Sequence, residues 1–300
     1  MTSGSAASIV LRAPIQFDAA NGDPIHAPVV LATIGAFHTR LVLDTGSDVH
    51  LLTAELAEAA GLSLTSVDEG TDHSGSSLDS WLVGDVSVTF DDSAPGGLLT
   101  LRDVVAIPAP AAFTAHGIGG ILSPQRLQPT AFAVIDEVLD ELSLIDGEAG
   151  EIRAWLLEAR GTPDVLVLPR RSGDLRPIVQ AAIEPHPDVA VLVNTGGRHT
   201  EFAREVVPGL AGGELERIGT GVSGAAVLGA RAGSAVLRLG EHRVALPSVL
   251  LRAGMDDPPA MLGQDVLRGT VVAVGPDPAT PVLWQVGELD AEVTGPSMGV

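Results

Sequence analysis

The sequence predicts a mainly β protein that is built from two similar halves and contains only short helices. Its apolar runs are short and rich in Val, Leu and Ile, and 35 glycines and 21 prolines interrupt them. This pattern is typical of many short strands joined by turns, and no long amphipathic helix is indicated. The same series of motifs occurs twice along the 300 residues, which indicates a duplicated structural unit.

The clearest part of the repeat is an apolar run that ends in a turn with one polar side chain. In the first copy, Leu41-Val42-Leu43 leads into Asp44-Thr45-Gly46-Ser47. In the second copy, Val191-Leu192-Val193 leads into Asn194-Thr195-Gly196-Gly197. Three β-prone residues before a glycine-containing turn predict a buried strand with an abrupt end. The copies differ in chemistry, because the first presents a carboxylate and the second presents an amide.

Two further segments keep the same order in both copies. A predicted strand at 29–34 (VVLATI) matches one at 178–183 (IVQAAI), about ten residues before each turn. The segment at 120–127 (GILSPQRL) parallels the segment at 260–267 (AMLGQDVL), near the end of each copy. The repeat therefore covers most of each half of the chain.

Short helices are expected at three places. Thr53 is a suitable N-cap for the segment AELAEAA that follows it, and Thr200 is in the equivalent place before EFAREVV. Residues 150–160 carry apolar side chains on one helical face and are followed by the stop signal Gly161-Thr162-Pro163. Residues 131–146 fit both helical and alternating spacing, and we favour a strand hairpin there.

With these motifs the chain resembles the aspartic peptidases, in the two-lobed arrangement of the pepsin-like enzymes and with lobe motifs nearer to the retropepsin-like type. The resemblance rests on DTGS at 44–47, NTGG at 194–197, GILS at 120–123 and MLGQDVL at 261–267, and it spans about residues 25–285. It implies a double-psi β-barrel-like fold with a pseudo-twofold internal repeat. The expected domains are an N-terminal leader or edge strand at 1–24, a first lobe at 25–145, an interlobe connection with a helix at 146–173, a second lobe at 174–287 and a tail at 288–300.

The resemblance assigns Asp44 and Asn194 to the two catalytic positions of an aspartic peptidase. Peptide hydrolysis at a carboxylate pair needs two carboxyls that share one proton, one acting as base and the other as acid. An Asn amide has nearly the shape of a protonated Asp, but it cannot give up a proton at ordinary pH. Hydrolysis is therefore expected to be weak or absent.

The neighbouring turn residues are expected to support this pair. In the family, the equivalents of Thr45 and Thr195 cross-link the two turns by hydrogen bonds, and Gly46 and Gly196 complete the turns. The Ser47 hydroxyl could bond the outer oxygen of Asp44, whereas Gly197 cannot help Asn194 in this way. Two departures in one turn favour a natural Asn194, although an engineered Asp-to-Asn change is an alternative.

A flap hairpin over the site is expected in the first lobe. The polar tip at 71–77 precedes an alternating strand at 81–88, where an aspartic peptidase lobe has its flap, and Gly75 would allow the turn. In the second lobe, residues 219–232 occupy the equivalent place, and their many small side chains predict a reduced or loosely structured flap. The candidate ligand-contacting residues of the first flap are Asp72, His73, Ser74, Gly75 and Ser76.

Composition sets the expected partners and location. The 38 acids and 17 bases give a net charge of -21, which disfavours nucleic acid and anionic membranes and favours cationic peptides. The chain has no cysteine, no secretory signal pattern and no apolar run near the ~20 residues that span a bilayer, so a cytoplasmic location is expected. The histidines lack metal-ligand spacing; we expect no metal or other cofactor and a monomeric chain.

Three functions remain open at this point. The chain could bind extended peptides in an interlobe cleft with impaired hydrolysis, or it could be an active endopeptidase, either because Asn194 is engineered or because Asp44 alone activates water. In the third case the cleft is vestigial and the acidic surface serves as a scaffold for assembly. Peptide binding discriminates the first two from the third, and turnover discriminates the first from the second.

Overall fold

The computed structural model describes residues 7–66, 70–72, 75–94, 96–160, 165–210, 212–255 and 257–285. It is mainly β, with 49% strand and 12% helix, and it contains a six-stranded barrel and further strands. The predicted mainly β class is therefore confirmed. Within the described ranges, no helix is long and apolar enough to cross a membrane.

Short strands form most of the two halves of the sequence, here taken as 8–146 and 166–285. The strands of the first half are β1 (Ser8–Asp18), β2 (Pro24–Ile34), β3 (Phe37–Leu43), β4 (Leu51–Thr53), β5 (Thr65–Ser66), β6 (Gly70–Thr71), β7 (Ser77–Leu78), β8 (Trp81–Phe90), β9 (Leu98–Ile107), β10 (Ile118–Leu122), β11 (Ala131–Asp136) and β12 (Glu141–Asp146). The strands of the second half are β13 (Leu166–Leu168), β14 (Ile178–Ile183), β15 (Val189–Val193), β16 (Glu201–Ala203), β17 (Glu216–Thr220), β18 (Ala226–Ala232), β19 (Ala235–Leu239), β20 (His242–Leu246), β21 (Val249–Arg252), β22 (Ala260–Leu262), β23 (Val271–Val274) and β24 (Val282–Gln285). The helices are α1 (Ala54–Ala59), α2 (Ala111–His116), α3 (Ala149–Arg160) and α4 (Gln264–Leu267), with 3-10 turns η1 (Pro124–Arg126) and η2 (Arg204–Val206).

A sheet of thirteen strands joins the two halves. In it, β1, β12 and β11 of the first half continue through an antiparallel β11–β23 pairing into β23, β24 and β13 of the second half. Ile135 lies opposite Val272 in this pairing, and both side chains are buried. Main-chain hydrogen bonds of the sheet thus cross directly from one half to the other.

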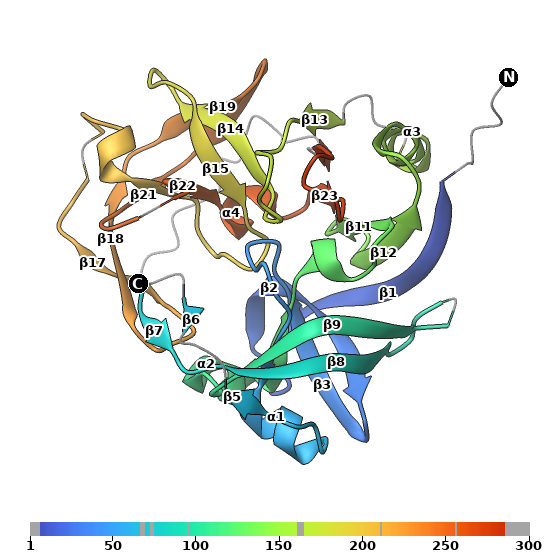
Figure 1. The fold of residues 1–300 in the computed structure, drawn as a ribbon. Coiled ribbons are helices and arrows are strands. Elements are labelled where there is room, and N and C mark those ends of the chain that lie inside the picture. Colours follow the sequence, from blue (N-terminus) through green and yellow to red (C-terminus); the bar gives the residue numbers. More distant parts are fainter. Residues whose placement is uncertain are drawn as a thin grey trace, which may run out of the picture.

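The remaining strands pair in the same way in the two halves. In the first half, β3 runs parallel to β10, which is antiparallel to β4, and β4 is parallel to β9. In the second half, β15, β22, β16 and β21 repeat these three pairings within a sheet of nine strands. Figure 1 shows the two groups on opposite sides, with β14, β15 and β22 in yellow to orange and β2, β3, β8 and β9 in blue to teal. The repeat in the sequence is thus matched by a repeat in strand pairing.

The N-terminal strand β1 is an interior strand, so the edge strand predicted for residues 1–24 is wrong. It lies between β12 and β2 in the sheet, pairing with β12 in its first part and with β2 in its last part. Its alternate side chains Leu11, Ala13 and Ile15 are buried. The strand thus links β12 to β2 by pairing with each along a different part of its length, and its buried apolar row packs in the core.

The helix after the first turn is confirmed, whereas the helix predicted after the second turn is wrong. The Thr53 side chain accepts a hydrogen bond from the Leu56 backbone N–H and caps α1. Thr200 instead precedes strand β16, and only the short turn η2 follows. The residue that occupies the cap position before η2 is Ala203, which makes no side-chain capping bond. Without that acceptor, the first helical N–H groups lack a side-chain partner.

The two other local predictions agree with the structure. Residues 131–146 form the antiparallel hairpin β11–β12, and the helix expected at 150–160 is α3. Its residues Ile152 and Leu156 are buried in an apolar cluster with Val271 and Leu283 of the joining sheet. This helix therefore covers one face of the strands that connect the two halves.

Trp284 on β24 provides a test of this joining sheet. Its side chain is fully buried, and its Nε1–H donates to Thr270 Oγ1 at 2.9 Å. We expect Trp284→Ala to lower the free energy of unfolding by about 3–5 kcal/mol, because a large buried ring is removed and a cavity remains. Urea denaturation measures the change. Trp155→Ala, at a half-buried position of α3, is the control and should cost clearly less; equal losses would contradict the central place of Trp284.

Candidate functional site

The two Thr-Gly turns are cross-linked by reciprocal hydrogen bonds of Thr45 and Thr195. The Thr45 hydroxyl donates to the Val193 carbonyl oxygen at 2.6 Å, and the Thr195 hydroxyl donates to the Leu43 carbonyl oxygen at 2.7 Å. Each hydroxyl oxygen also accepts the backbone N–H of the other threonine, at 3.0 and 3.1 Å. Both threonines are fully buried, so the strand ends that carry Asp44 and Asn194 are joined by direct hydrogen bonds in the interior.

Asp44 and Asn194 lie next to each other across this cross-link. A methyl group on Gly196 would overlap the Asp44 carboxyl group, and a methyl group on Gly46 would lie 2.7 Å from Asn194 Cγ. Each polar side chain thus covers the glycine of the opposite turn. Glycine is required at both places, because any Cβ atom would displace one of the two functional side chains.

The backbone of each turn fixes the orientation of its polar side chain. Asp44 Oδ1 accepts the N–H of Gly46 at 2.8 Å. Asn194 Oδ1 accepts the N–H groups of Gly196 and Gly197 at 2.9 and 3.1 Å. Since backbone N–H groups can only donate, the amide oxygen of Asn194 must face the turn. Its Nδ2 donates to the Met261 sulfur at 2.9 Å, which is a weak acceptor.

The expected hydrogen bond from the Ser47 hydroxyl to the outer oxygen of Asp44 is not formed. It donates to the Val49 carbonyl oxygen at 2.7 Å, and a hydroxyl has only one hydrogen to donate. The bond to Asp44 is therefore not made. In the other turn, a Cβ atom on Gly197 would lie 3.1 Å from both Asn194 Nδ2 and the Met261 sulfur, so the glycine leaves room for the Asn194–Met261 contact.

Two buried glutamines hold the turns by donating hydrogen bonds to their carbonyl oxygens. The sequence motifs did not identify these two residues as part of the site. Gln125 Nε2 donates to the carbonyl oxygens of Thr45 and Ser47 at 3.2 and 2.8 Å. Gln264 Nε2 donates to the carbonyl oxygen of Thr195 at 2.8 Å and to Glu137 Oε1 at 2.9 Å. Both follow the repeated apolar segments at 120–122 and 260–262 closely, which is the signal that could have identified them.

His50 has a structural role behind the first turn. Its Nδ1 accepts the Ser123 N–H at 3.2 Å, and its Nε2–H donates to the Arg126 carbonyl oxygen at 3.3 Å. Burial lowers the pKa of His50 to about 4, so the ring is neutral at neutral pH. In the second half, Thr200 Oγ1 accepts the Gly263 N–H at 3.2 Å in the equivalent place.

Among the candidate flap residues, Asp72 makes a hydrogen bond to the second half. Asp72 Oδ1 accepts the Ser76 N–H at 3.3 Å, and Asp72 Oδ2 accepts the Ser223 N–H at 2.9 Å. Gly75 has a positive φ of 80° in the turn of the short β6–β7 hairpin, as expected. His73 and Ser74 lie outside the described residues. The tip of the first-half hairpin therefore touches the turn between β17 and β18.

Of the two alternatives for the second flap, reduced or loosely structured, the loosely structured one is wrong. Strands β17 and β18 pair antiparallel, from Glu216 opposite Gly229 to Thr220 opposite Ala226. Small residues at 221–225 form the turn, in which Gly224 has a positive φ of 84°. Small side chains here allow a tight turn and do not prevent pairing of the strands.

Two cavities border the contact between the hairpin tips, one at Ser223 and one at Asp72. The first has a volume of about 360 Å³ and is lined by residues 77–79, 108–111 and 222–224. The second has a volume of about 180 Å³, and its lining includes Asp72, Leu192, Met255 and Met261. Because Met261 also accepts a hydrogen bond from Asn194, the second cavity adjoins the Asp44–Asn194 pair.

The arginines that line the second cavity are paired with acids. Arg252 Nη1 lies 3.4 Å from Glu201 Oε2 in a buried pair, and Arg176 Nη2 lies 2.8 Å from Asp174 Oδ2. Partial burial acts to raise the pKa of Asp174, but hydrogen bonds from Arg176 outweigh it and hold the pKa below its ordinary value. The charges of this cavity are therefore largely balanced. Within the described part of the chain, no group of three or more His, Asp and Glu side chains could hold a metal ion.

Comparison with known proteins gives no family for the chain. The sequence matches no protein-family model and no curated protein. The functional argument therefore depends on the motifs and on the geometry of the site.

The threonine cross-link gives a direct prediction for stability. Thr45→Ala and Thr195→Ala each remove a buried hydroxyl that donates once and accepts once, and we expect each to lower the free energy of unfolding by about 1–3 kcal/mol. The double variant should lose less than the sum of the single variants, because the two residues share one network. Urea denaturation of the three variants measures this coupling, and strictly additive losses would contradict a shared network.

Glu137 is a buried acid that accepts a hydrogen bond from Gln264. Only 7% of the residue is exposed, and burial raises its pKa to about 7, although the hydrogen bond from Gln264 and the charge of Arg268 act in the opposite direction. Its Oε2 atom is buried and has no hydrogen-bond partner among the described residues. Protonation of Glu137 would remove a negative charge that burial disfavours.

The pKa of Glu137 predicts a pH dependence of stability. Folding raises this pKa from 4.5 to about 7, so the folded protein binds the proton more tightly than the unfolded chain does. Protonated Glu137 therefore contributes about 3 kcal/mol to the free energy of unfolding. This contribution is fully present below about pH 4.5 and is lost as pH rises through 7. Glu137→Gln should remove this part of the pH dependence in urea denaturation from pH 4 to 8. An unchanged pH profile in the variant would refute the assignment.

Proposed function

We propose that this chain is an aspartic-peptidase-like protein with a two-lobed fold, which binds extended peptides between its lobes and hydrolyses them poorly or not at all. The observation that carries the proposal is the reciprocal Thr45–Thr195 cross-link, which sets Asp44 beside Asn194. Four hydrogen bonds of 2.6–3.1 Å make this junction. Such a junction positions two side chains from separate halves on one small substrate group.

The chemistry of the pair explains the loss of hydrolysis. In a working pair, one carboxylate takes a proton from water while the other, protonated, donates to the peptide carbonyl. Asp44 can still act as the base. Asn194 can donate a hydrogen bond but cannot transfer a proton, so the tetrahedral intermediate receives no proton from this side. Asn194 can therefore help to hold a peptide carbonyl without promoting its cleavage.

The surroundings of the pair support binding of an extended peptide. The hairpin tips meet at Asp72 and Ser223; Ser223 lines one cavity and Asp72 lines another. Two cavities suit two side chains of one strand-like peptide, while main-chain groups of the hairpins offer hydrogen bonds to its backbone. The net charge of -21 favours the approach of cationic peptides.

Restoring the second carboxylate tests the proposal. We expect Asn194→Asp to cleave members of a diverse peptide library between pH 3 and 7, at rates at least about 10²–10⁴ times those of the unmodified chain. Cleavage is measured by mass spectrometry of the products. The Asn194→Asp/Asp44→Ala variant is the control and should be inactive.

The other outcomes separate the alternatives. If the unmodified chain cleaves peptides and Asp44→Ala abolishes cleavage, one carboxylate suffices and the chain is an active peptidase. If neither the unmodified chain nor Asn194→Asp binds or cleaves any peptide, the peptide-binding function is wrong and a scaffold role remains.

A further inference from the structure

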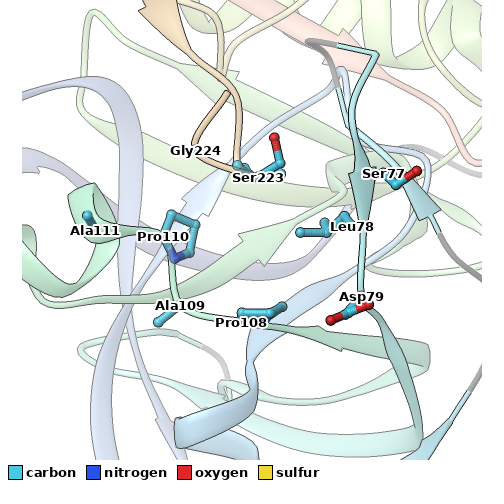
Figure 2. Close-up of a pocket in the computed structure, with 10 residues that line it drawn as sticks. Ser77, Leu78, Asp79, Pro108, Ala109, Pro110, Ala111, Ser223 and Gly224 are labelled. Atoms are coloured by element: carbon cyan, nitrogen blue, oxygen red, sulfur yellow. The ribbon is translucent and has the colours of Figure 1, made fainter. Parts of the chain in front are cut away.

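The larger cavity is formed by three segments from both halves of the chain. Figure 2 shows residues of β7 and the following Asp79 on one side, the loop that joins β9 to α2 on the other, and the β17–β18 turn above. The turn residue Val222 also packs against an apolar cluster that includes Val42 and Ile121, and Val42 lies two residues before Asp44. The cavity is thus adjacent to the first-half side of the candidate site.

The lining of this cavity combines apolar side chains with the polar residues Ser77, Asp79 and Ser223. The side chain of Leu78 points into it, and the ring of Pro110 faces Leu78 from the opposite wall (Figure 2). Pro108 and Val222 add further apolar surface. Asp79 is the one ionisable residue of the lining, and its exposed side chain has no ion-pair partner in the part of the chain that the structure describes. The cavity therefore offers apolar side chains beside a negative charge and two serines.

This charge pattern distinguishes the two cavities. The smaller one contains the arginines 176 and 252, each paired with an acid, together with two methionines. The larger one carries a single acid without a compensating base in its lining. The two cavities would therefore select different side chains, and the larger one would favour a cation.

We propose that the larger cavity, called here the Asp79 pocket, is a binding site for a lysine or arginine side chain of a bound peptide. The proposal rests on the proposed peptide-binding function. The aliphatic stem of either side chain would pack on Leu78, Pro108 and Pro110, while its charged head remains in water at the rim beside Asp79. Neither charge has to be fully desolvated, so the pair is free of the penalty that makes buried ion pairs unfavourable.

A positional peptide scan tests this preference. A set of fluorescent decapeptides, with Lys, Gln or Glu placed at each position in turn, is titrated with the unmodified chain and followed by fluorescence anisotropy. At one position we expect Lys to bind about fivefold more tightly than Gln, as for a partly exposed ion pair, and Glu to bind more weakly than Gln. Asp79→Asn should abolish this difference, and Asp79→Lys should reverse it in favour of Glu.

Asp85→Lys is the matched control for charge. Asp85 is an exposed residue of β8 outside the pocket, and the substitution changes the net charge by the same two units as Asp79→Lys. The preference for Lys should persist in this variant. A preference that vanishes equally in both lysine variants would reflect the overall charge of the protein and would overturn the proposal.

A second measurement separates the pocket from the peptide-binding function. N-acetyl-lysine N-methylamide and its uncharged norleucine analogue are titrated into the unmodified chain, and backbone amide shifts are followed by NMR. Shifts confined to residues such as Leu78, Ala109 and Ser223, larger for the lysine compound and lost in Asp79→Asn, would support the pocket even if no decapeptide binds. Peptides that bind without positional preference, together with no local shifts, would overturn the pocket and leave the peptide-binding function intact.

Discussion

The structure depends on the pair of buried threonine hydroxyls that connect the two turns. Each hydroxyl donates to a carbonyl oxygen of the opposite strand end and accepts the N–H of the opposite threonine. Four backbone groups at the ends of two apolar strands would otherwise be buried without partners, which is costly. The same bonds determine where Asp44 and Asn194 stand, so stability and the geometry of the site have one origin.

Symmetry of the backbone and asymmetry of the side chains coexist at this junction. Strand pairings, threonines and turn glycines are matched between the halves, and Gln125 and Gln264 both hold the carbonyl oxygens of the turns. The side chains that face a ligand differ: a carboxylate beside an amide, and a cavity with one acid beside a cavity with balanced charges. A peptide lying across the junction would therefore meet two unlike half-sites and could be bound in one direction.

The sequence predicts the features that depend on local patterns. The apolar run before Asp44, the hairpin at 131–146 and the helix capped by Thr53 are all present. The helix expected after Thr200 is not, because the repeat places the cap three residues later, at Ala203, where the side chain has no acceptor. Similarity between the two halves therefore predicts which segment follows the second turn, but it does not predict that this segment forms a strand and a 3-10 turn.

Contacts between distant segments were beyond the reach of these patterns. Asp72 was a candidate because of its place at a predicted turn, yet its bond to the Ser223 N–H depends on how two hairpins meet in space. The hydrogen of the Ser47 hydroxyl has several acceptors within its reach, and only the folded turn shows that it goes to Val49. The segment 108–110 between β9 and α2 lines a cavity together with residues 222–224 of the second half, a contact that no local pattern in the sequence indicates.

The pairing of β11 with β23 also determines how far the chain can be divided. A fragment that ends at Asp146 would retain β1, β12 and β11 but would leave the outer edge of β11 without its partner strand. Ala133, Val134 and Ile135 on this strand are buried in the whole chain and would then lie on an open, apolar edge of the kind that promotes aggregation. Either half expressed by itself is accordingly an incomplete folding unit.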